Sequence, residues 1–248
     1  MLTLPSTACF LATAWLAEVI GTMAGFGAAT VLTPIASYFL PMKTAVAVVA
    51  CFHLFGNASR LHFFKRQIRW PIVWRFGLPG VGFAFGAAQM AARLPGHAIR
   101  ASLGAFLVLY VALELARWST VRLSPTSTTL VTGGIVSGSI AGLIGTGGAV
   151  RSVCLLAFGL PKETYIATSA VIALAVDATR LPVYLAQGFV PTTTWPVLAG
   201  LVVMAFLGAW TGQRLVRRIS AEAFHRVVLA VLALMGAKLL LDGLRGMG

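Results

Sequence analysis

The chain has 248 residues, of which 58% are hydrophobic and only 10% are charged, and its formal net charge is +13 at pH 7. Soluble proteins carry about 25% charged residues, so this sequence has too few polar side chains to cover a water-soluble globule. The composition predicts an integral membrane protein and excludes a soluble enzyme, a disordered chain and a disulfide-rich secreted domain. The basic residues stand at the ends of apolar stretches and form no continuous stripe, which is typical of cytoplasmic loops and excludes nucleic acid as a partner.

The first apolar stretch, residues 8–40, is too long for one membrane-spanning helix. A span needs about 20 residues, whereas a straight helix of this length extends about 50 Å, beyond the roughly 30 Å hydrocarbon layer. Gly25 and Gly27 lie near its middle, and glycine allows the backbone to bend sharply. We expect a re-entrant helical hairpin that enters from outside. No Lys or Arg precedes the apolar run, so we expect the N-terminus to belong to the mature fold rather than to a signal peptide.

Three ordinary spanning helices are expected next, at 44–64, 72–92 and 99–117. The connection between the first two is rich in positive charge, which places it in the cytoplasm; its basic residues are Arg60, Lys65, Arg66, Arg69 and Arg75. The third helix then ends on the cytoplasmic side, where residues 118–126 are expected to form a linker.

A second long apolar stretch, 127–160, contains the run Gly145-Thr146-Gly147-Gly148. The connection 186–194 has no charged residue, so it is expected outside, and the preceding helix 164–187 must start in the cytoplasm. Both ends of the long stretch are then cytoplasmic, and the chain has to turn back on itself at the glycines. We therefore expect a second re-entrant hairpin.

Two further spans, 192–213 and 224–244, complete the predicted topology and leave both termini outside. The three cysteines lie in apolar stretches without CxxC spacing, so they indicate neither a disulfide framework nor a metal site; they are Cys9, Cys51 and Cys154. The glycine run of the second hairpin follows no strand and precedes no Lys-Ser/Thr pair, so it does not predict a phosphate-binding loop. No cofactor is expected.

An internal repeat relates the two halves of the chain. At a shift of 120 without gaps, residues 21–80 match 141–200 at sixteen positions, which include glycines, prolines and an arginine. The repeats are residues 1–117 and 127–248, and each holds one hairpin and three spans, an odd number of crossings. The second copy is therefore expected upside down relative to the first. The predicted fold is an all-α integral membrane protein of two inverted-topology repeats, an architecture typical of secondary transporters with a substrate site near the midplane.

The repeats share two further features after each glycine tip, a proline fourteen residues on and then a helix with a polar pair: Pro41 with Asn57-x-x-Arg60, and Pro161 with Asp177-x-x-Arg180. This pattern resembles the TauE/SafE family, also called the sulfite exporter or TSUP family, over almost the whole chain. The resemblance implies a multi-pass protein of the bacterial inner membrane that exports sulfite or small organosulfonates such as sulfoacetate. The first tip departs from the family pattern, because Ala28 and Ala29 stand where further glycine is common.

Ionisable side chains at membrane depth indicate a site, because each costs at least about 2.5–3.5 kcal/mol at a helix centre unless it is paired or needed. Arg151 begins the returning leg of the second hairpin, where its guanidinium and the free backbone N–H groups can hold sulfonate oxygens. An internal pair with a carbonyl or a carboxylate is the alternative. The other candidate substrate contacts are His53, Asn57, Arg60, Arg180, Gly25, Gly27, Gly145, Thr146, Gly147 and Gly148.

The pairing of these charges leaves alternatives open. Asp177 and Arg180 share a helix face, which predicts an ion pair that leaves the arginine only partly available to an anion. Arg60 has no carboxylate at the equivalent position, so it is expected to be less neutralised and either to bind an anion or to extend to the headgroups. His53 is either a proton carrier or a structural histidine. Glu18, in the first hairpin, is a second candidate for coupling or charge pairing.

The expected function is a secondary transporter that exports a small anion by movement of one repeat against the other. An anion channel is the first alternative, since it uses the same residues. An intramembrane enzyme is the second; the chain has no GxSG motif, no HExxH motif and no close carboxylate pair, so we expect no enzyme. The expected partners are the anion and the lipid bilayer, and a homodimer is left open.

Overall fold

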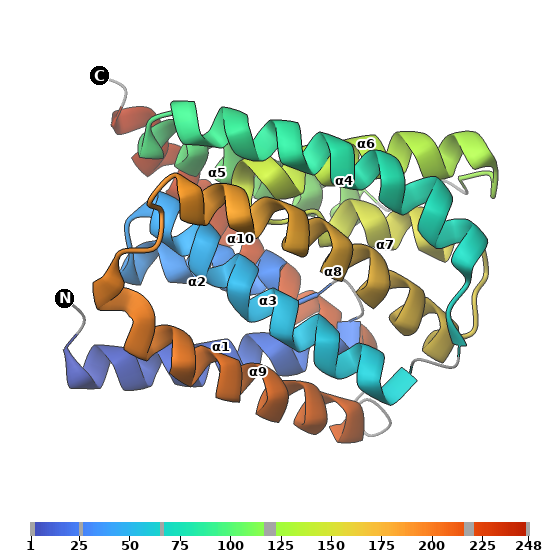
Figure 1. Ribbon diagram of the computed structural model, residues 1–248, viewed down its shortest axis with the longest axis horizontal. Coiled ribbons are helices and arrows are strands. Elements are labelled where there is room, and N and C mark those ends of the chain that lie inside the picture. Colours follow the sequence, from blue (N-terminus) through green and yellow to red (C-terminus); the bar gives the residue numbers. More distant parts are fainter. Residues whose placement is uncertain (1–2, 25–26, 65–66, 117–122, 216–220, 247–248) are drawn as a thin grey trace.

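The computed structural model describes residues 3–24, 27–64, 67–116, 123–215 and 221–246. Every regular element in these ranges is a helix (Figure 1). In chain order the helices are α1 Leu4–Ala24, α2 Ala29–Phe39, α3 Met42–Phe64, α4 Trp70–Arg93, α5 Gly96–Leu115, α6 Ser127–Ile144, α7 Gly148–Leu156, α8 Lys162–Ala186, the short 3-10 helix η3 Thr192–Thr194, α9 Trp195–Leu215 and α10 Ala221–Arg245.

The two long apolar stretches are each broken into a long and a short helix. The first contains α1 and α2, and the second contains α6 and α7. Gly145 ends α6 with φ +87°, and Gly27 stands in the first break with φ +89°. Side chains with a Cβ rarely adopt this left-handed conformation, so glycine is needed at both breaks. Gly25, the other predicted tip glycine of the first hairpin, lies outside the described residues.

Among the described residues, six helical segments are long and apolar enough to cross a membrane: Leu4–Met23, Met42–His62, Gly96–Leu115, Ser127–Ile144, Lys162–Ala186 and Thr192–Leu215. The predicted spans 72–92 and 224–244 are present as helices α4 and α10 but are not in this set. Four glycines and two prolines lower the hydropathy of α4. The long legs α1 and α6 are in the set instead. These helices make the chain a multi-pass membrane protein.

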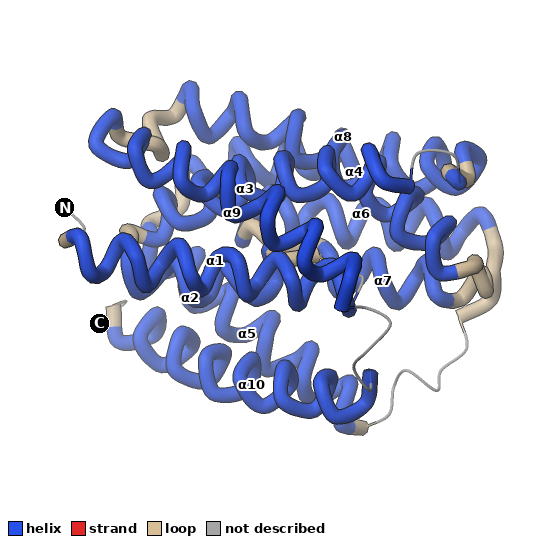
Figure 2. Tube along the Cα trace, turned by 90° about the horizontal axis from the view of Figure 1, so that it is seen from below, coloured by secondary structure: helices blue, strands red, loops and turns tan. Residues whose placement is uncertain are grey.

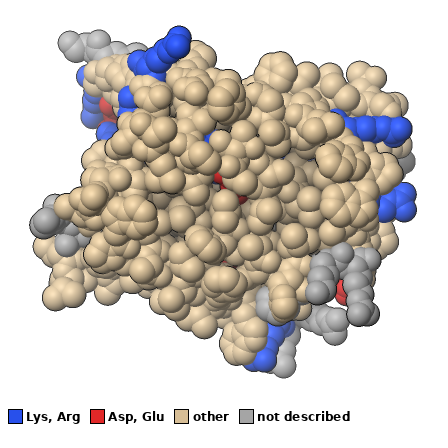
Figure 3. Space-filling view, in the orientation of Figure 1, with Lys and Arg blue, Asp and Glu red and all other residues tan. Residues whose placement is uncertain are grey.

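The surface has the charge distribution of a protein surrounded by lipid. Helix connections gather at the two ends of the long axis, and both termini lie at the same end in both views (Figures 1 and 2). Lys and Arg side chains lie at the ends of the face shown in Figure 3, and its broad middle carries almost none. Large apolar side chains are exposed instead, among them Leu78, Phe83, Phe85, Val203, Phe206 and Leu207.

Helices α3 and α8 form the centre of the molecule and pack against each other. Around them, α4 packs on α6 and α8, while α9 packs on α1 and α3, and α5 packs on α10. The second spanning helix of each predicted repeat therefore packs against the hairpin of the other repeat. The position of α3 and α8 brings the polar residues of both helices into the interior.

Glycine allows the closest of these contacts. A Cβ atom on Gly138 of α6 would lie 2.1 Å from the carbonyl oxygen of Gly80 on α4, and one on Gly208 of α9 would lie 2.6 Å from Cβ of Glu18 on α1. Side chains at these positions would push the helices apart. The close approach of α9 to α1 determines where the carboxylate of Glu18 lies.

Candidate functional site

The ionisable groups predicted at membrane depth gather in one buried cluster between α3 and α8. His53, Asn57 and Arg60 share a face of α3 because they are spaced four and three residues apart, and Asp177 and Arg180 face them from α8. All five residues are at most 5% exposed. The polar residues of the two central helices therefore face each other rather than lipid.

Asp177 binds three side chains of this cluster. Its Oδ1 accepts a hydrogen bond of 2.9 Å from Nε of Arg180, and the ion pair with the same guanidinium has an N–O distance of 2.7 Å. Its Oδ2 lies 2.7 Å from Nδ1 of His53 and 3.5 Å from Nδ2 of Asn57. The ion pair expected within α8 is present, and the same carboxylate also joins α8 to α3.

Arg180 extends the contacts to the second hairpin. Its Nη1 donates a hydrogen bond of 2.7 Å to the carbonyl oxygen of Ala141, in the last turn of α6. The hydroxyl of Tyr184, one turn further along α8, donates to the carbonyl oxygen of Gly142 at 2.6 Å. Because these carbonyls lie where α6 ends, α8 holds the second hairpin next to its tip.

The positive charge of Arg60 is paired with a carboxylate, although its own helix, α3, supplies none. Its Nη2 contacts the carboxylate of Glu18 on α1, its Nε donates to Thr22 Oγ1 at 3.1 Å and its Nη1 donates to Asn57 Oδ1 at 2.9 Å. The prediction of a less neutralised Arg60 is wrong, because the carboxylate comes from another helix; a contact between Arg60 and an anion stays a prediction. A Cβ on Gly56 would lie 2.7 Å from both carboxylate oxygens of Glu18, so this contact needs the glycine.

Arg151 is the one buried arginine of the cluster that no described carboxylate neutralises. It is 4% exposed on α7, and its Nε donates a hydrogen bond of 2.9 Å to the hydroxyl of Ser169 on α8. The alternative of an internal carboxylate pair is not seen among the described residues. With Arg151 and Glu18 included, the cluster combines three arginines with two carboxylates, and with a neutral histidine its net charge is +1.

The tips of the two helical hairpins, between α1 and α2 and between α6 and α7, border the cluster on one side. The hydroxyl oxygens of Thr30 and Thr146 are 2.7 Å apart. A Cβ on Gly27 would lie 2.5 Å from Nε2 of His53, so this glycine lets the first tip approach the histidine. In the second tip, Ser137 Oγ donates to the carbonyl oxygen of Gly147 at 2.8 Å, and Gly148 starts α7.

Two short helices begin at these tips and point their N-termini at the cluster. The first N–H groups of a helix have no partner within it and carry a partial positive charge. Neither Ala28 before α2 nor Gly147 before α7 provides a side-chain cap. Together with the net positive charge, these donors suit a small anion. Among the described residues, no three His, Cys, Asp or Glu side chains are placed to hold a metal ion.

A family model described as sulfite exporter TauE/SafE matches residues 10–239. The chain belongs to the TauE/SafE family. The family consists of membrane transporters, and the resemblance expected from the glycine tips and the two polar pairs is confirmed. The chain matches no curated protein and no solved structure.

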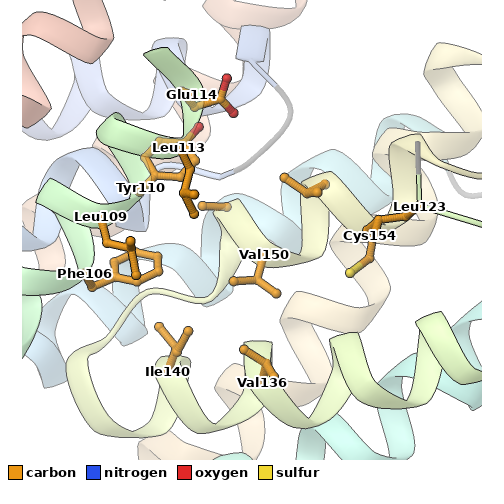
Figure 4. Close-up of a pocket in the computed structure, with 12 residues that line it drawn as sticks. Phe106, Leu109, Tyr110, Leu113, Glu114, Leu123, Val136, Ile140, Val150 and Cys154 are labelled. Atoms are coloured by element: carbon orange, nitrogen blue, oxygen red, sulfur yellow. The ribbon is translucent and has the colours of Figure 1, made fainter. Parts of the chain in front are cut away.

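An apolar pocket of this TauE/SafE protein lies apart from the charged cluster, between α5, α6 and α7 (Figure 4). Its volume is about 320 Å³, and its lining is almost entirely apolar. Phe106, Leu109, Val136, Ile140 and Val150 are among the lining residues. None of the predicted site residues lines this pocket, and its walls offer a small anion few donors.

Several contacts of the site were not predicted from the sequence. The omitted residues are Thr22, Thr30, Ser169 and Tyr184. Ser169 and Tyr184 could have been found, because they share one face of α8 with Asp177 and Arg180 at helical spacing. Thr22 and Thr30 carry no such signal, since their partners lie on other helices.

Proposed function

We propose that this TauE/SafE protein is a secondary transporter that exports small sulfur-containing anions, sulfite or organosulfonates such as sulfoacetate, across the bacterial inner membrane. The observation that carries the proposal is the buried guanidinium of Arg151, which has no carboxylate partner among the described residues. A planar guanidinium can hold two oxygens of a sulfonate or sulfite group at once. The family supports the same class of substrate.

The helix ends at the tips support an anion site at this depth. Interrupted helices whose N-termini point at the substrate are common in secondary transporters, because the partial positive charge of the helix end stabilises an anion. Here α2 and α7 both begin at the cluster. An anion beside Arg151 then meets a guanidinium and the free N–H groups of Gly148 and Ala149 in the first turn of α7.

The packing of helices supports two inverted-topology repeats and alternating access. The contact of α4 with α6 has its counterpart in the contact of α9 with α1, and that of α4 with α8 has its counterpart in that of α9 with α3. Such a relationship is expected where two copies of one unit pack about a twofold axis. We propose that one hairpin with its partner helices moves against the other and opens the cluster to each side in turn.

An anion channel shares all these residues, so transport measurements must separate the two mechanisms. Purified protein in liposomes loaded with unlabelled sulfoacetate is expected to take up labelled sulfoacetate faster than empty liposomes do. With the membrane potential clamped at zero, a channel gives flux without this stimulation from the opposite side. Sulfite, thiosulfate, sulfate and the zwitterion taurine, each tested as the internal solute, then rank the substrates.

Matched variants test the site. Arg151→Ala is expected to abolish the exchange, whereas Arg75→Ala, which removes an exposed arginine of α4, is expected to leave it intact. If the wild-type protein exchanges none of these solutes, the proposed function is overturned.

A further inference from the structure

His53 and Asp177 form a buried pair whose hydrogen-bond roles follow from chemistry. The distance between His53 Nδ1 and Asp177 Oδ2 is 2.7 Å, and both side chains are at most 5% exposed. A carboxylate only accepts hydrogen bonds, so Nδ1 carries a proton and donates it. Asn57 Nδ2 donates to the backbone carbonyl of His53 at 2.9 Å. In the neutral imidazole this leaves Nε2 with a lone pair.

That lone pair of His53 accepts no hydrogen bond from any described residue. Nε2 is buried and has no hydrogen-bond partner among the described residues. It points at the tip of the first hairpin, where a Cβ on Gly27 would lie only 2.5 Å away. A structural histidine normally satisfies both ring nitrogens, because a buried unpaired acceptor costs about 1–3 kcal/mol. An unpartnered nitrogen in a charged cluster indicates a place where a proton can bind.

Charges on three helices act on this imidazole. Asp177 on α8 attracts a proton to it, and the guanidiniums of Arg60 on α3 and Arg151 on α7 oppose a further positive charge. The nearest other carboxylate, Glu18 on α1, is paired with Arg60. The described residues of the first tip add no ionisable group.

An anion at Arg151 changes this balance. With a neutral imidazole the cluster carries one net positive charge, and protonation of His53 without an anion raises it to two in a site where charges interact strongly. An anion at Arg151 removes that excess, so anion binding and protonation of His53 favour each other. By linkage the effect is reciprocal.

We propose that His53, oriented by Asp177, is the proton-carrying residue of this transporter, so that each anion crosses the membrane together with one proton. The inference rests on the proposed function and adds its coupling ion. Nε2 accepts a proton from water on the side from which the anion enters and returns it to water on the other side, while Asp177 stays ionised. A divalent anion that leaves with one proton still carries negative charge outward, the direction favoured by a membrane potential that is negative inside.

Transport of sulfoacetate in liposomes tests the proposal, because this anion stays divalent around neutral pH. With the membrane potential clamped at zero, an interior more alkaline by about one pH unit is expected to drive accumulation of about tenfold, the ratio for one coupled proton. A pH-sensitive dye inside the vesicles is expected to report acidification when sulfoacetate is added outside.

Variants separate the coupling step from the anion site. His53→Gln can still donate to Asp177 but cannot take a proton at neutral pH, so accumulation and dye response are expected to be lost. Counterflow exchange is expected to fall as well, because protonation of His53 and anion binding favour each other. His97→Gln on α5, outside the cluster, is the matched control and is expected to keep all three readouts. Full gradient-driven accumulation in His53→Gln overturns the assignment of the residue.

The wild-type protein alone also decides the matter, even if His53→Gln does not fold. If the wild type shows counterflow exchange but net uptake of sulfoacetate into empty vesicles gives no dye response, no proton moves with the anion, which overturns the coupling while the proposed function stands. Loss of counterflow exchange itself in the wild type overturns the proposed function, and the coupling with it.

Discussion

The side-chain hydroxyls of Thr30 and Thr146 lie 2.7 Å apart and join the tips of the two hairpins in the interior of the protein. The two residues are 116 positions apart in the chain. Thr30 belongs to the first turn of α2, and Thr146 lies between α6 and α7. In the proposed alternating access, movement of one hairpin against the other breaks this contact, so cross-linking it tests that mechanism.

A disulfide at this contact is expected to stop transport. The double variant Thr30→Cys with Thr146→Cys, made after Cys9, Cys51 and Cys154 have been replaced by alanine, should lose counterflow exchange on oxidation and regain it on reduction. Each single cysteine variant is the control and should not respond to the oxidant. If the protein is fully cross-linked and still exchanges anions, the two tips do not separate during transport.

Loss of the guanidinium of Arg151, which has no carboxylate partner among the described residues, is expected to weaken anion binding strongly. A charge-assisted hydrogen-bonded contact in a dry site is worth several kcal/mol, so Arg151→Ala should reduce the affinity for a sulfonate on the order of a hundredfold. Arg151→Lys keeps the charge but loses the planar fork, so its affinity should fall between those of the wild type and the alanine variant. Calorimetry on purified protein measures both. Wild-type affinity in Arg151→Ala would move the anion site to Arg60 and Arg180.

The carboxylate of Glu18 is expected to matter for stability. Glu18→Gln leaves the guanidinium of Arg60 buried without its counter-charge, and breaking a buried pair on one side costs about 3–5 kcal/mol. The thermal midpoint of the purified protein should therefore fall. The double variant Glu18→Gln with Arg60→Gln has no uncompensated charge and should recover most of the loss. An equal fall in the single and the double variant would show that the pair itself, rather than the lone charge, controls stability.

The contrast between Glu18 and Asp177 shows what the sequence can predict. The pair of Asp177 with Arg180 follows from a spacing of three on one helix, so helix geometry alone predicts it. The pair of Glu18 with Arg60 joins two helices and depends on close contacts at Gly56 and Gly208. No local pattern encodes such a contact, because it is set by how α1 packs against α3 and α9.

The same distinction applies to the helices. Apolar length and loop charge predict the helical segments and the two interruptions, since glycine and hydropathy act locally. The meeting of the tips at Thr30 and Thr146 is a tertiary contact and was not predicted. Hydropathy also ranks α4 too low for a typical span, although one of its glycines, Gly80, lies in close contact with α6.

The orientation in the membrane is expected to follow the distribution of charge in the loops. The connection between α8 and α9 has no charged residue, whereas the connection between α3 and α4 is rich in Lys and Arg, so the first is expected outside and the second in the cytoplasm. Thr192, before α9, and Ser124, before α6, are both exposed, and α9 and α6 begin toward opposite ends of the molecule (Figure 1). In a protein without native cysteines, Thr192→Cys should react with a membrane-impermeant thiol reagent added to intact cells, and Ser124→Cys should react only after the membrane is opened. The reverse labelling pattern would invert the topology, and labelling of both from outside would show that α6 and α7 do not form a hairpin entered from the cytoplasm.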